Sequence, residues 1–260
     1  MGSVFMKTRK PLLLIAALIL VGQSALAIVN IESIRLKDSS KNVLASLTFK
    51  ANKNEGNSNT NNLSLSADTR VKRNGYEHLF VASGKYGESQ GVQNANKLLG
   101  HYRFVWTPQL VWSKEYFVQI EKDEFKKLSL RTLAGLGLRQ RLHKDDNIQV
   151  YAGLGVFYSR EEYKDTSKNS KSSENLARAN LYLSVKLDLD EKISFLSINY
   201  FQPVVDDLSD YRFLTDDQFV VKATEHFSVA FVYQQTHDNK PPLGVKKTDH
   251  QYGTTLKFNF

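Results

Sequence analysis

The chain contains no cysteine. This absence excludes a disulfide framework, a thiolate nucleophile, a cysteine-based zinc site and a lipid-modified N-terminal cysteine. Beyond its first 27 residues the chain also lacks any apolar stretch of the roughly 20 residues that a membrane-crossing helix needs. A helical membrane protein is therefore excluded. A membrane β-barrel is not, because its strands alternate apolar and polar residues.

The longest apolar run, Leu12–Val21, follows Lys7, Arg9 and Lys10 and precedes Ala25–Ala27. A positive start, a short apolar run and a small-x-small sequence are typical of a cleaved secretory signal peptide. We predict cleavage after residue 27, which leaves 233 of the 260 residues. An uncleaved anchor is the alternative, although the run is short for a spanning helix.

Charge is modest once this signal is removed. The signal carries three cations and no acid, so the net charge of +8 falls to +5 in the mature chain. Lysines and acids are interspersed rather than grouped in blocks, which argues against a nucleic-acid partner. The mature length suits one large all-β domain. We predict a short periplasmic segment at 28–42, followed by a barrel at 43–260.

From residue 43 to the end, apolar and polar residues alternate. In the run Leu128–Arg139, one face carries mainly apolar residues such as Leu136 and Leu138, and the other carries polar residues such as Arg131. An amphipathic helix would instead repeat its apolar residues at intervals of three and four. Most runs span more than the ~5–6 residues of a globular strand and reach the ~9–11 residues of a membrane strand. Strand length therefore favours a closed transmembrane barrel over a secreted β-sandwich.

We predict about twelve antiparallel strands in an up-and-down barrel. They cover residues 43–53, 60–73, 76–87, 95–106, 114–122, 126–141, 147–160, 174–189, 192–203, 209–222, 225–237 and 247–260. Tight connections such as Asn74-Gly75 and Asp190-Glu191 alternate with longer polar ones such as Gly87–Asn94 and Glu161–Ser173. Outer-membrane barrels have short periplasmic turns and long external loops, so this alternation predicts termini in the periplasm.

Aromatic residues gather near the ends of the runs, as at Phe104 and Trp106. Such residues form girdles at the two membrane interfaces of a barrel. The final strand resembles the assembly signal of outer-membrane proteins. This signal consists here of Gln251, Gly253, Leu256, Phe258 and Phe260.

Several segments together resemble one protein family. They are Leu128–Arg141, Val150–Tyr163, Asn199–Pro203, Asp210–Phe213 and Lys240–Asp249. The region from residue 54 to residue 260 resembles the YdiY-like family of salt-induced outer-membrane proteins, a domain of unknown function. The resemblance implies a β-barrel in the outer membrane of a Gram-negative cell. It implies a stress-linked role but no particular activity.

The polar face of the strands supplies candidates for the lining of the lumen. They are Asp68, Arg70, Arg131, Arg139, Arg178 and Lys186. If this face surrounds an open lumen, its excess of cations favours a small anionic solute. An internal ion-pair network that fills the barrel is the alternative. The strand number does not decide between a filled and an open lumen, because twelve lies between the ~8 strands of filled barrels and the ~16 strands of open ones. Four inward glycines, at positions 135, 137, 153 and 155, are expected to make room for bulky side chains across the lumen or to permit curvature.

An enzymatic role has one candidate pair, His226 and Ser228, which share a strand face. They suggest a lipid hydrolase, but no acid at matching spacing orients the histidine. Neighbours on a strand point to opposite faces, so the doublets Asp206-Asp207 and Asp216-Asp217 are not carboxylate pairs. We therefore predict a non-enzymatic protein, a narrow pore or an envelope-integrity component, with no metal or cofactor. Its expected partners are outer-membrane lipids, lipopolysaccharide and the outer-membrane assembly machinery.

Overall fold

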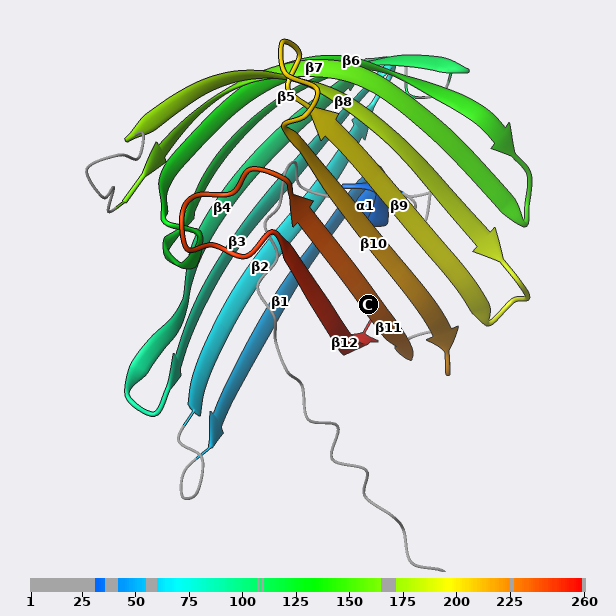
Figure 1. Ribbon diagram of the computed structural model, residues 1–260. Coiled ribbons are helices and arrows are strands. Elements are labelled where there is room, and N and C mark those ends of the chain that lie inside the picture. Colours follow the sequence, from blue (N-terminus) through cyan, green and yellow to red (C-terminus); the bar gives the residue numbers. More distant parts are fainter. Residues whose placement is uncertain are drawn as a thin grey trace, which may run out of the picture.

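The computed structural model describes residues 31–35, 42–54, 60–106, 108, 110–164, 172–224 and 227–258. They form one antiparallel sheet in which each of twelve strands pairs with the next strand along the chain. The strands are β1 (Val43–Asn54), β2 (Thr60–Arg73), β3 (Tyr76–Ser89), β4 (Val92–Trp106), β5 (Trp112–Asp123), β6 (Leu128–Lys144), β7 (Ile148–Tyr163), β8 (Ser173–Asp188), β9 (Ile193–Pro203), β10 (Tyr211–Lys222), β11 (Phe227–Asp238) and β12 (Thr248–Phe258). The sheet curves strongly around a central space (Figure 1). The predicted all-β, up-and-down architecture of twelve strands is confirmed.

The two faces of the sheet are chemically opposite. Along β5, Tyr116, Val118 and Ile120 are exposed on the convex face, while Glu115 and Gln119 are buried on the concave face. A soluble protein places its apolar residues inside, whereas a barrel that crosses a membrane turns them outward to lipid. The inversion explains why the sequence alternates so regularly at a low mean hydropathy.

Closure of the barrel was expected from the sequence, but the sheet is not closed within the described residues. There β1 pairs with β2 and β12 pairs with β11, and no ladder joins β1 to β12. Alternation assigns each residue to a face but does not fix strand tilt and stagger, on which closure depends. Lipid cannot satisfy the backbone groups of a free edge, so closure in the membrane remains our prediction.

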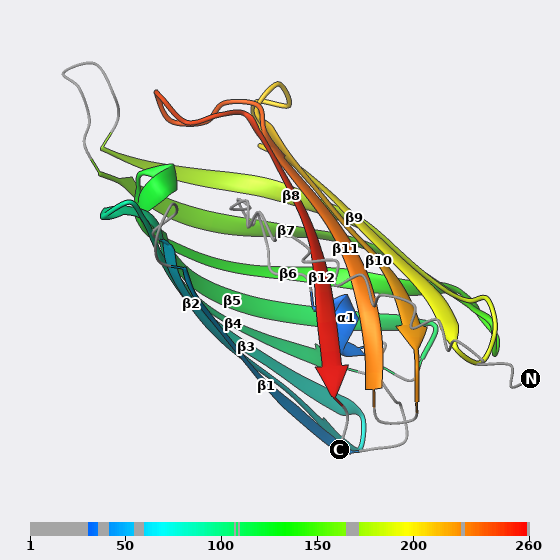
Figure 2. The same cartoon turned by 90° about the horizontal axis from the view of Figure 1, so that it is seen from below.

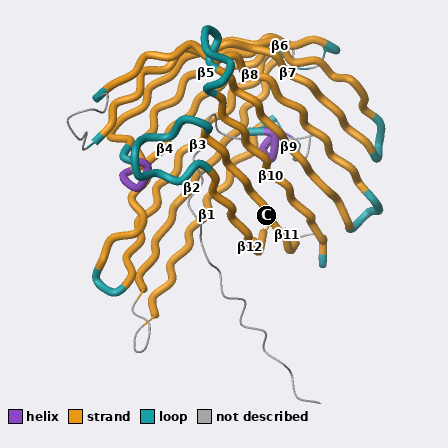
Figure 3. Tube along the Cα trace, in the orientation of Figure 1, coloured by secondary structure: helices purple, strands orange, loops and turns teal. Residues whose placement is uncertain are grey.

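The connection between β3 and β4 differs from the predicted long loop at Gly87–Asn94. Both strands extend further, and only Gln90 and Gly91 separate them, with φ of 53° and 76°. Two successive positive φ angles are the geometry of a type I′ hairpin turn. The sequence contained little sign of this turn because glutamine, unlike asparagine, seldom occupies the left-handed region. Figure 3 shows the loops and turns of the described residues at the two ends of the strands.

Exposed aromatic side chains lie at one end of the sheet. We call this the short-turn end, since it holds the tight turns 74–75, 145–147 and 189–192; the long-loop end, with 204–210 and 239–247, is opposite. Trp106 and Trp112 are exposed there, and the Lys114 ammonium lies 4.9 Å from the Trp106 ring centre. This arrangement agrees with the predicted aromatic girdle.

The inward glycines accommodate rings of the adjacent strand. Gly153 lies opposite Tyr182, and a Cβ at Gly153 would lie 1.9 Å from that ring. Gly135 faces Phe117 in the same way, with a closest approach of 2.4 Å. Both glycines make room for bulky side chains, but these lie on the neighbouring strands and not across the lumen as predicted.

We expect Gly153→Ala to lower the free energy of unfolding by about 1–3 kcal/mol, because the methyl group overlaps the Tyr182 ring. Urea unfolding in lipid vesicles measures the change. Gly253→Ala is the matched control, since nothing lies within 4 Å of its added Cβ. In a Tyr182→Leu background the cost of Gly153→Ala should shrink. A cost that is unchanged by the loss of the ring would contradict this assignment.

Two short helical turns complete the structure. Helix α1 (Glu32–Arg35) lies on the concave side of the sheet, as both ribbon views show (Figure 1, Figure 2). The 3-10 turn η1 (Glu124–Lys126) joins β5 to β6, and Asp123 caps it by accepting from the backbone N–H groups of Phe125 and Lys126. Neither helix of the described chain is long and apolar enough to cross a membrane. The sequence did not indicate that residues 31–35 lie against the inner wall.

Candidate functional site

The inner wall of the sheet carries a dense and nearly balanced set of buried charges. Among the described residues they are Arg35, Arg70, Arg103, Arg131, Arg139, Arg178 and Arg212, with Glu77, Glu115, Glu121, Asp123, Glu161 and Asp216. Seven arginines thus face six carboxylates. Buried charges are tolerated only when they are paired, so the ion pairs determine how this lumen is filled.

Glu115 is the centre of the network near the short-turn end. Its carboxylate accepts from Arg35 at 2.5 Å and from Arg103 at 2.9 Å. The Tyr182 hydroxyl, three strands away on β8, donates to the same carboxylate at 3.3 Å. Arg139 on β6 lies over the Tyr151 ring at 3.5 Å. This group therefore connects β4, β5 and β8 across the concave face.

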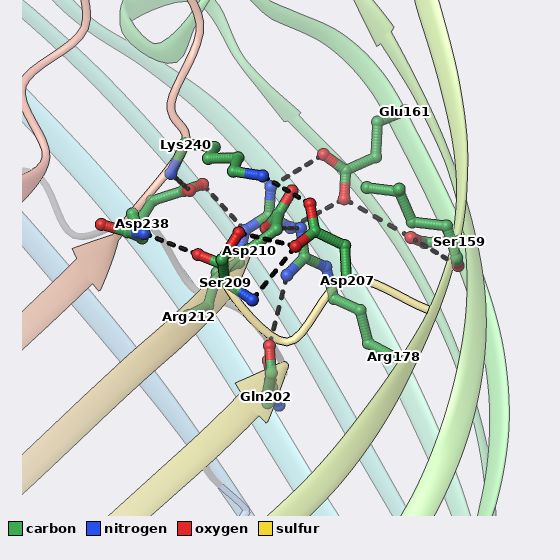
Figure 4. A network of polar contacts seen from close by, with 12 residues as sticks. Ser159, Glu161, Arg178, Gln202, Asp207, Ser209, Asp210, Arg212, Asp238 and Lys240 are labelled. Atoms are coloured by element: carbon green, nitrogen blue, oxygen red, sulfur yellow. Dashed lines mark hydrogen bonds and ion pairs between the residues drawn. The ribbon is translucent and has the colours of Figure 1, made fainter. Parts of the chain in front are cut away.

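Glu161 is the centre of a second network toward the long-loop end (Figure 4). Arg212 on β10 donates two hydrogen bonds to it, at 2.7 and 2.9 Å, across the three-strand interval from β7. The Nε of Arg212 also donates to Asp238 at 2.8 Å. Arg131 lies between Glu121 and Glu161 in the strand register and forms an ion pair with Glu121. Bidentate guanidinium–carboxylate pairs are among the strongest polar contacts in proteins, so this network braces the wall.

The connections at the long-loop end are joined by further ion pairs. Lys240, between β11 and β12, pairs with Asp207, between β9 and β10, at 2.5 Å. Lys126 of η1 lies 3.2 Å from Asp249, at the start of β12. The loop between β11 and β12 therefore contacts the β9–β10 connection, and the start of β12 contacts η1.

Lys126 should titrate near neutral pH. Burial, reinforced by the nearby charge of Lys97, lowers the pKa of Lys126 from 10.5 to about 8 despite the opposing effect of Asp249. Between these values the unfolded chain binds more protons than the folded one, so stability should rise with pH across this window. We expect Lys126→Met to remove this rise. Unfolding curves of both proteins from pH 7 to pH 10 measure it, and identical pH profiles would contradict the assignment.

The predicted lumen residues all lie on the concave side. Arg70, Arg131, Arg139 and Arg178 are buried, whereas Asp68 and Lys186 are half-buried. Their contacts differ: Arg70 contacts α1, Arg178 donates to Asp210 at 2.9 Å, and Lys186 donates to Asp188 at 2.6 Å.

Sequence reasoning missed the acids that neutralise this face. Glu115, Glu121 and Glu161 occupy polar-face positions of their strands, so the alternation itself could have revealed them. The partner of each acid depends on strand register and on contacts across the lumen, which alternation does not provide. The ion-pair network, which the sequence left open as an alternative to an open basic lumen, is present.

Only one residue of the candidate catalytic pair lies within the described part of the chain. His226 lies outside the described residues, and Ser228 is buried on the inner face of β11. Asp216 is buried and accepts hydrogen bonds from the side chains of Gln218 and Gln234, so its contacts are those of a structural residue. Asp206, like Asp207, lies in the exposed connection between β9 and β10. No group of three or more acids or histidines in the described part of the chain is arranged to hold a metal ion.

The predicted assembly signal is partly described. Gln251 and Gly253 pair with Gln234 and Val232 of β11, so this part of the signal is strand as expected. The side chains of Leu256 and Phe258, and the whole of Phe260, lie outside the described residues.

Comparison with known proteins identifies the family and the fold of the chain. The family model described as "Protein of unknown function, DUF481" matches residues 47–260. No curated protein matches the chain.

Two solved structures are similar to it at low sequence identity. The translocator domain of the autotransporter NalP from Neisseria meningitidis is 10% identical, with a TM-score of 0.50 over 88% of this chain and 92% of that one. The NanC porin is 9% identical, with a TM-score of 0.49 over 84% and 99%. The likeness to the translocator domain shows the fold, an antiparallel barrel of the outer-membrane type.

Proposed function

Because the chain belongs to the DUF481 family of proteins of unknown function, we propose a function from the lumen itself: a non-enzymatic outer-membrane protein that acts as a narrow pore, closed at rest. The buried, paired charges of the inner wall carry this proposal. A barrel that served only as a membrane anchor could be filled with apolar side chains, which are often as stabilising as buried ion pairs or more so. A charged lining suits a path through which water and small ions pass.

The lining allows only a weak preference for anions. Seven buried arginines, one of them Arg35 on α1, face six carboxylates, so the lumen that the sequence predicted to be basic carries an excess of one cation among its buried charges while α1 is in place. Electrostatic selectivity depends on the net field in the pore. We therefore expect a small, mildly anion-selective conductance.

Planar-bilayer recording of the refolded protein tests this function. We expect infrequent, small conductance steps and a reversal potential in a salt gradient that favours anions. Arg139→Gln should shift that potential toward cations, because it removes a buried lumen charge. Arg160→Gln makes the same charge change on the outer face, where Arg160 pairs with Glu162, and should leave the potential unchanged.

An envelope-integrity role with a permanently filled lumen is the second candidate, and the closed ion-pair networks at both ends of the strands favour it. A protein that refolds fully, as shown by its shift on unheated gels, yet never conducts would support this role and exclude the pore. A lipid hydrolase using His226 and Ser228 has less support, because Ser228 is buried on the inner face. Lipid hydrolysis that disappears in Ser228→Ala would overturn the non-enzymatic proposal.

A further inference from the structure

The inner wall carries an apolar patch on β3 and β4, and this patch is covered. Leu79 on β3 and Leu99 and Val105 on β4 are all buried on the concave face, among polar neighbours such as Arg103 and Glu77. Apolar side chains that face an aqueous lumen are unfavourable unless something removes them from water. The patch is therefore the kind of surface that receives an apolar ligand.

The N-terminal segment of the chain supplies that ligand. Ile31 is fully buried and Ile34 is 5% exposed, and both pack in one cluster with Leu79, Leu99 and Val105. Ile34 lies in α1 and Ile31 directly precedes it, 45 or more positions before the leucines that they contact. The contact thus joins the first described segment of the chain to the inner wall at β3 and β4.

Charge complementarity fixes the same segment in place. The guanidinium of Arg35 donates to Glu115 at 2.5 Å and lies 3.8 Å from Glu77. Arg70 donates to the backbone carbonyls of Arg35 at 2.9 Å and of Ile34 at 3.4 Å. The carbonyls at the end of a helical turn have no partner within the turn, and Arg70 satisfies them. The wall therefore recognises both the side chain and the backbone of α1.

The segment binds close to one mouth of the barrel, and a short stretch of chain, which we call the tether, joins it to β1. Glu77 is the second residue of β3, directly after the turn 74–75, which places the contact near the short-turn end. Seven residues, 36–42, separate α1 from β1. A chain of that length spans up to roughly 25 Å, so α1 could leave its site and return while β1 stays paired.

We propose that Ile31–Arg35 is a tethered ligand that closes the short-turn end of the lumen. The wall around it is a binding site for a guanidinium group flanked by aliphatic side chains. This site is formed by Glu77 and Glu115 on one side and by Leu79, Leu99 and Val105 on the other. The claim that this segment closes the lumen rests on the proposed pore function. The claim that the segment occupies a binding site on the wall does not.

Chemical labelling tests the binding site without reference to conductance. The chain has no cysteine, so Ile34→Cys introduces a single thiol. A membrane-impermeant maleimide should label it at least tenfold more slowly than Leu110→Cys, which is exposed at the short-turn end. Adding Glu77→Gln and Glu115→Gln should raise the rate at residue 34 while residue 110 stays unchanged. Equal labelling of the two sites in the otherwise unaltered protein would overturn the proposal.

Conductance tests the closure. In a variant with Ile31→Ser, Ile34→Ser and Arg35→Gln, we expect the open probability to rise at least tenfold. Lys37→Gln, which removes a charge from the tether, is the matched control and should not change it. A synthetic peptide of residues 28–37 should block the triple variant from the short-turn side, and a peptide with serine at positions 31 and 34 should not.

The possible outcomes separate the two proposals. If residue 34 is protected but neither protein conducts, the pore fails and the binding site stands. If residue 34 is protected and the triple variant conducts no more than the unaltered protein, the segment binds but does not close the lumen, and the closure is wrong. If residue 34 labels freely, the tethered ligand is wrong, whatever the conductance.

Discussion

Replacing Glu161 by glutamine is expected to destabilise the barrel by about 3 kcal/mol, because it removes the negative charge that compensates a buried guanidinium. The amide keeps only one acceptor oxygen, so Arg212 cannot keep both of its hydrogen bonds of 2.7 and 2.9 Å, and its Nε contact with Asp238 is its remaining ion pair. The hydroxyl of Tyr163, which donates to the same carboxylate at 2.6 Å, loses a charged acceptor. Glu161 is 1% exposed, so water does not replace these contacts.

Glu162→Gln is the control, one residue further along the same strand. Glu162 pairs with Arg160 in an exposed position, where ion pairs contribute less than about 1 kcal/mol. The fluorescence of the two tryptophans, Trp106 and Trp112, reports urea unfolding of the protein in lipid vesicles. Equal losses in the two variants would show that the network at Glu161 does not brace the wall.

The second large effect concerns the convex face. Leu136→Arg should lower the free energy of unfolding by about 2–4 kcal/mol, the cost of an arginine near the middle of a bilayer on the lipid face of a barrel. Leu136 is exposed at the middle of β6 and lies opposite Tyr116 and Val156, which are also exposed. On a water-exposed surface the same substitution would change stability by only about 0.5 kcal/mol.

Leu208→Arg serves as the control for this substitution. Leu208 is more exposed than Leu136 but lies in the connection between β9 and β10, beyond the strands. The same vesicle assay should show little change for it. If Leu136→Arg were as mild as Leu208→Arg, the convex face would not lie in lipid, and the membrane assignment would fail.

The sequence predicted the architecture well for a simple physical reason. In a membrane barrel each strand must turn one face to lipid, so period-two alternation over ten or more residues is imposed on every strand. Twelve strands and most of their boundaries followed from this pattern. The β3–β4 hairpin was missed because the pattern does not report turn type, and Gln90 is an unusual residue for a positive φ.

The candidate site was predicted less completely. Alternation placed Arg131 and Arg178 on the inner face, where they are buried. It did not show that Arg212 reaches Glu161 from three strands away, or that Tyr182 reaches Glu115. Such contacts depend on the curvature of the sheet. The excess of inward cations expected from the sequence was therefore overestimated.

By itself, the sequence determined which residues face lipid and which face inward, and how many strands carry them, because both are local consequences of strand geometry. Only the tertiary structure decided how the inward charges neutralise one another, since pairing across the lumen joins residues up to 80 positions apart. It also decided the place of Ile31–Arg35. Five residues without strand alternation carry no signal of burial, and the surface that buries them exists only once β3, β4 and β5 have come together.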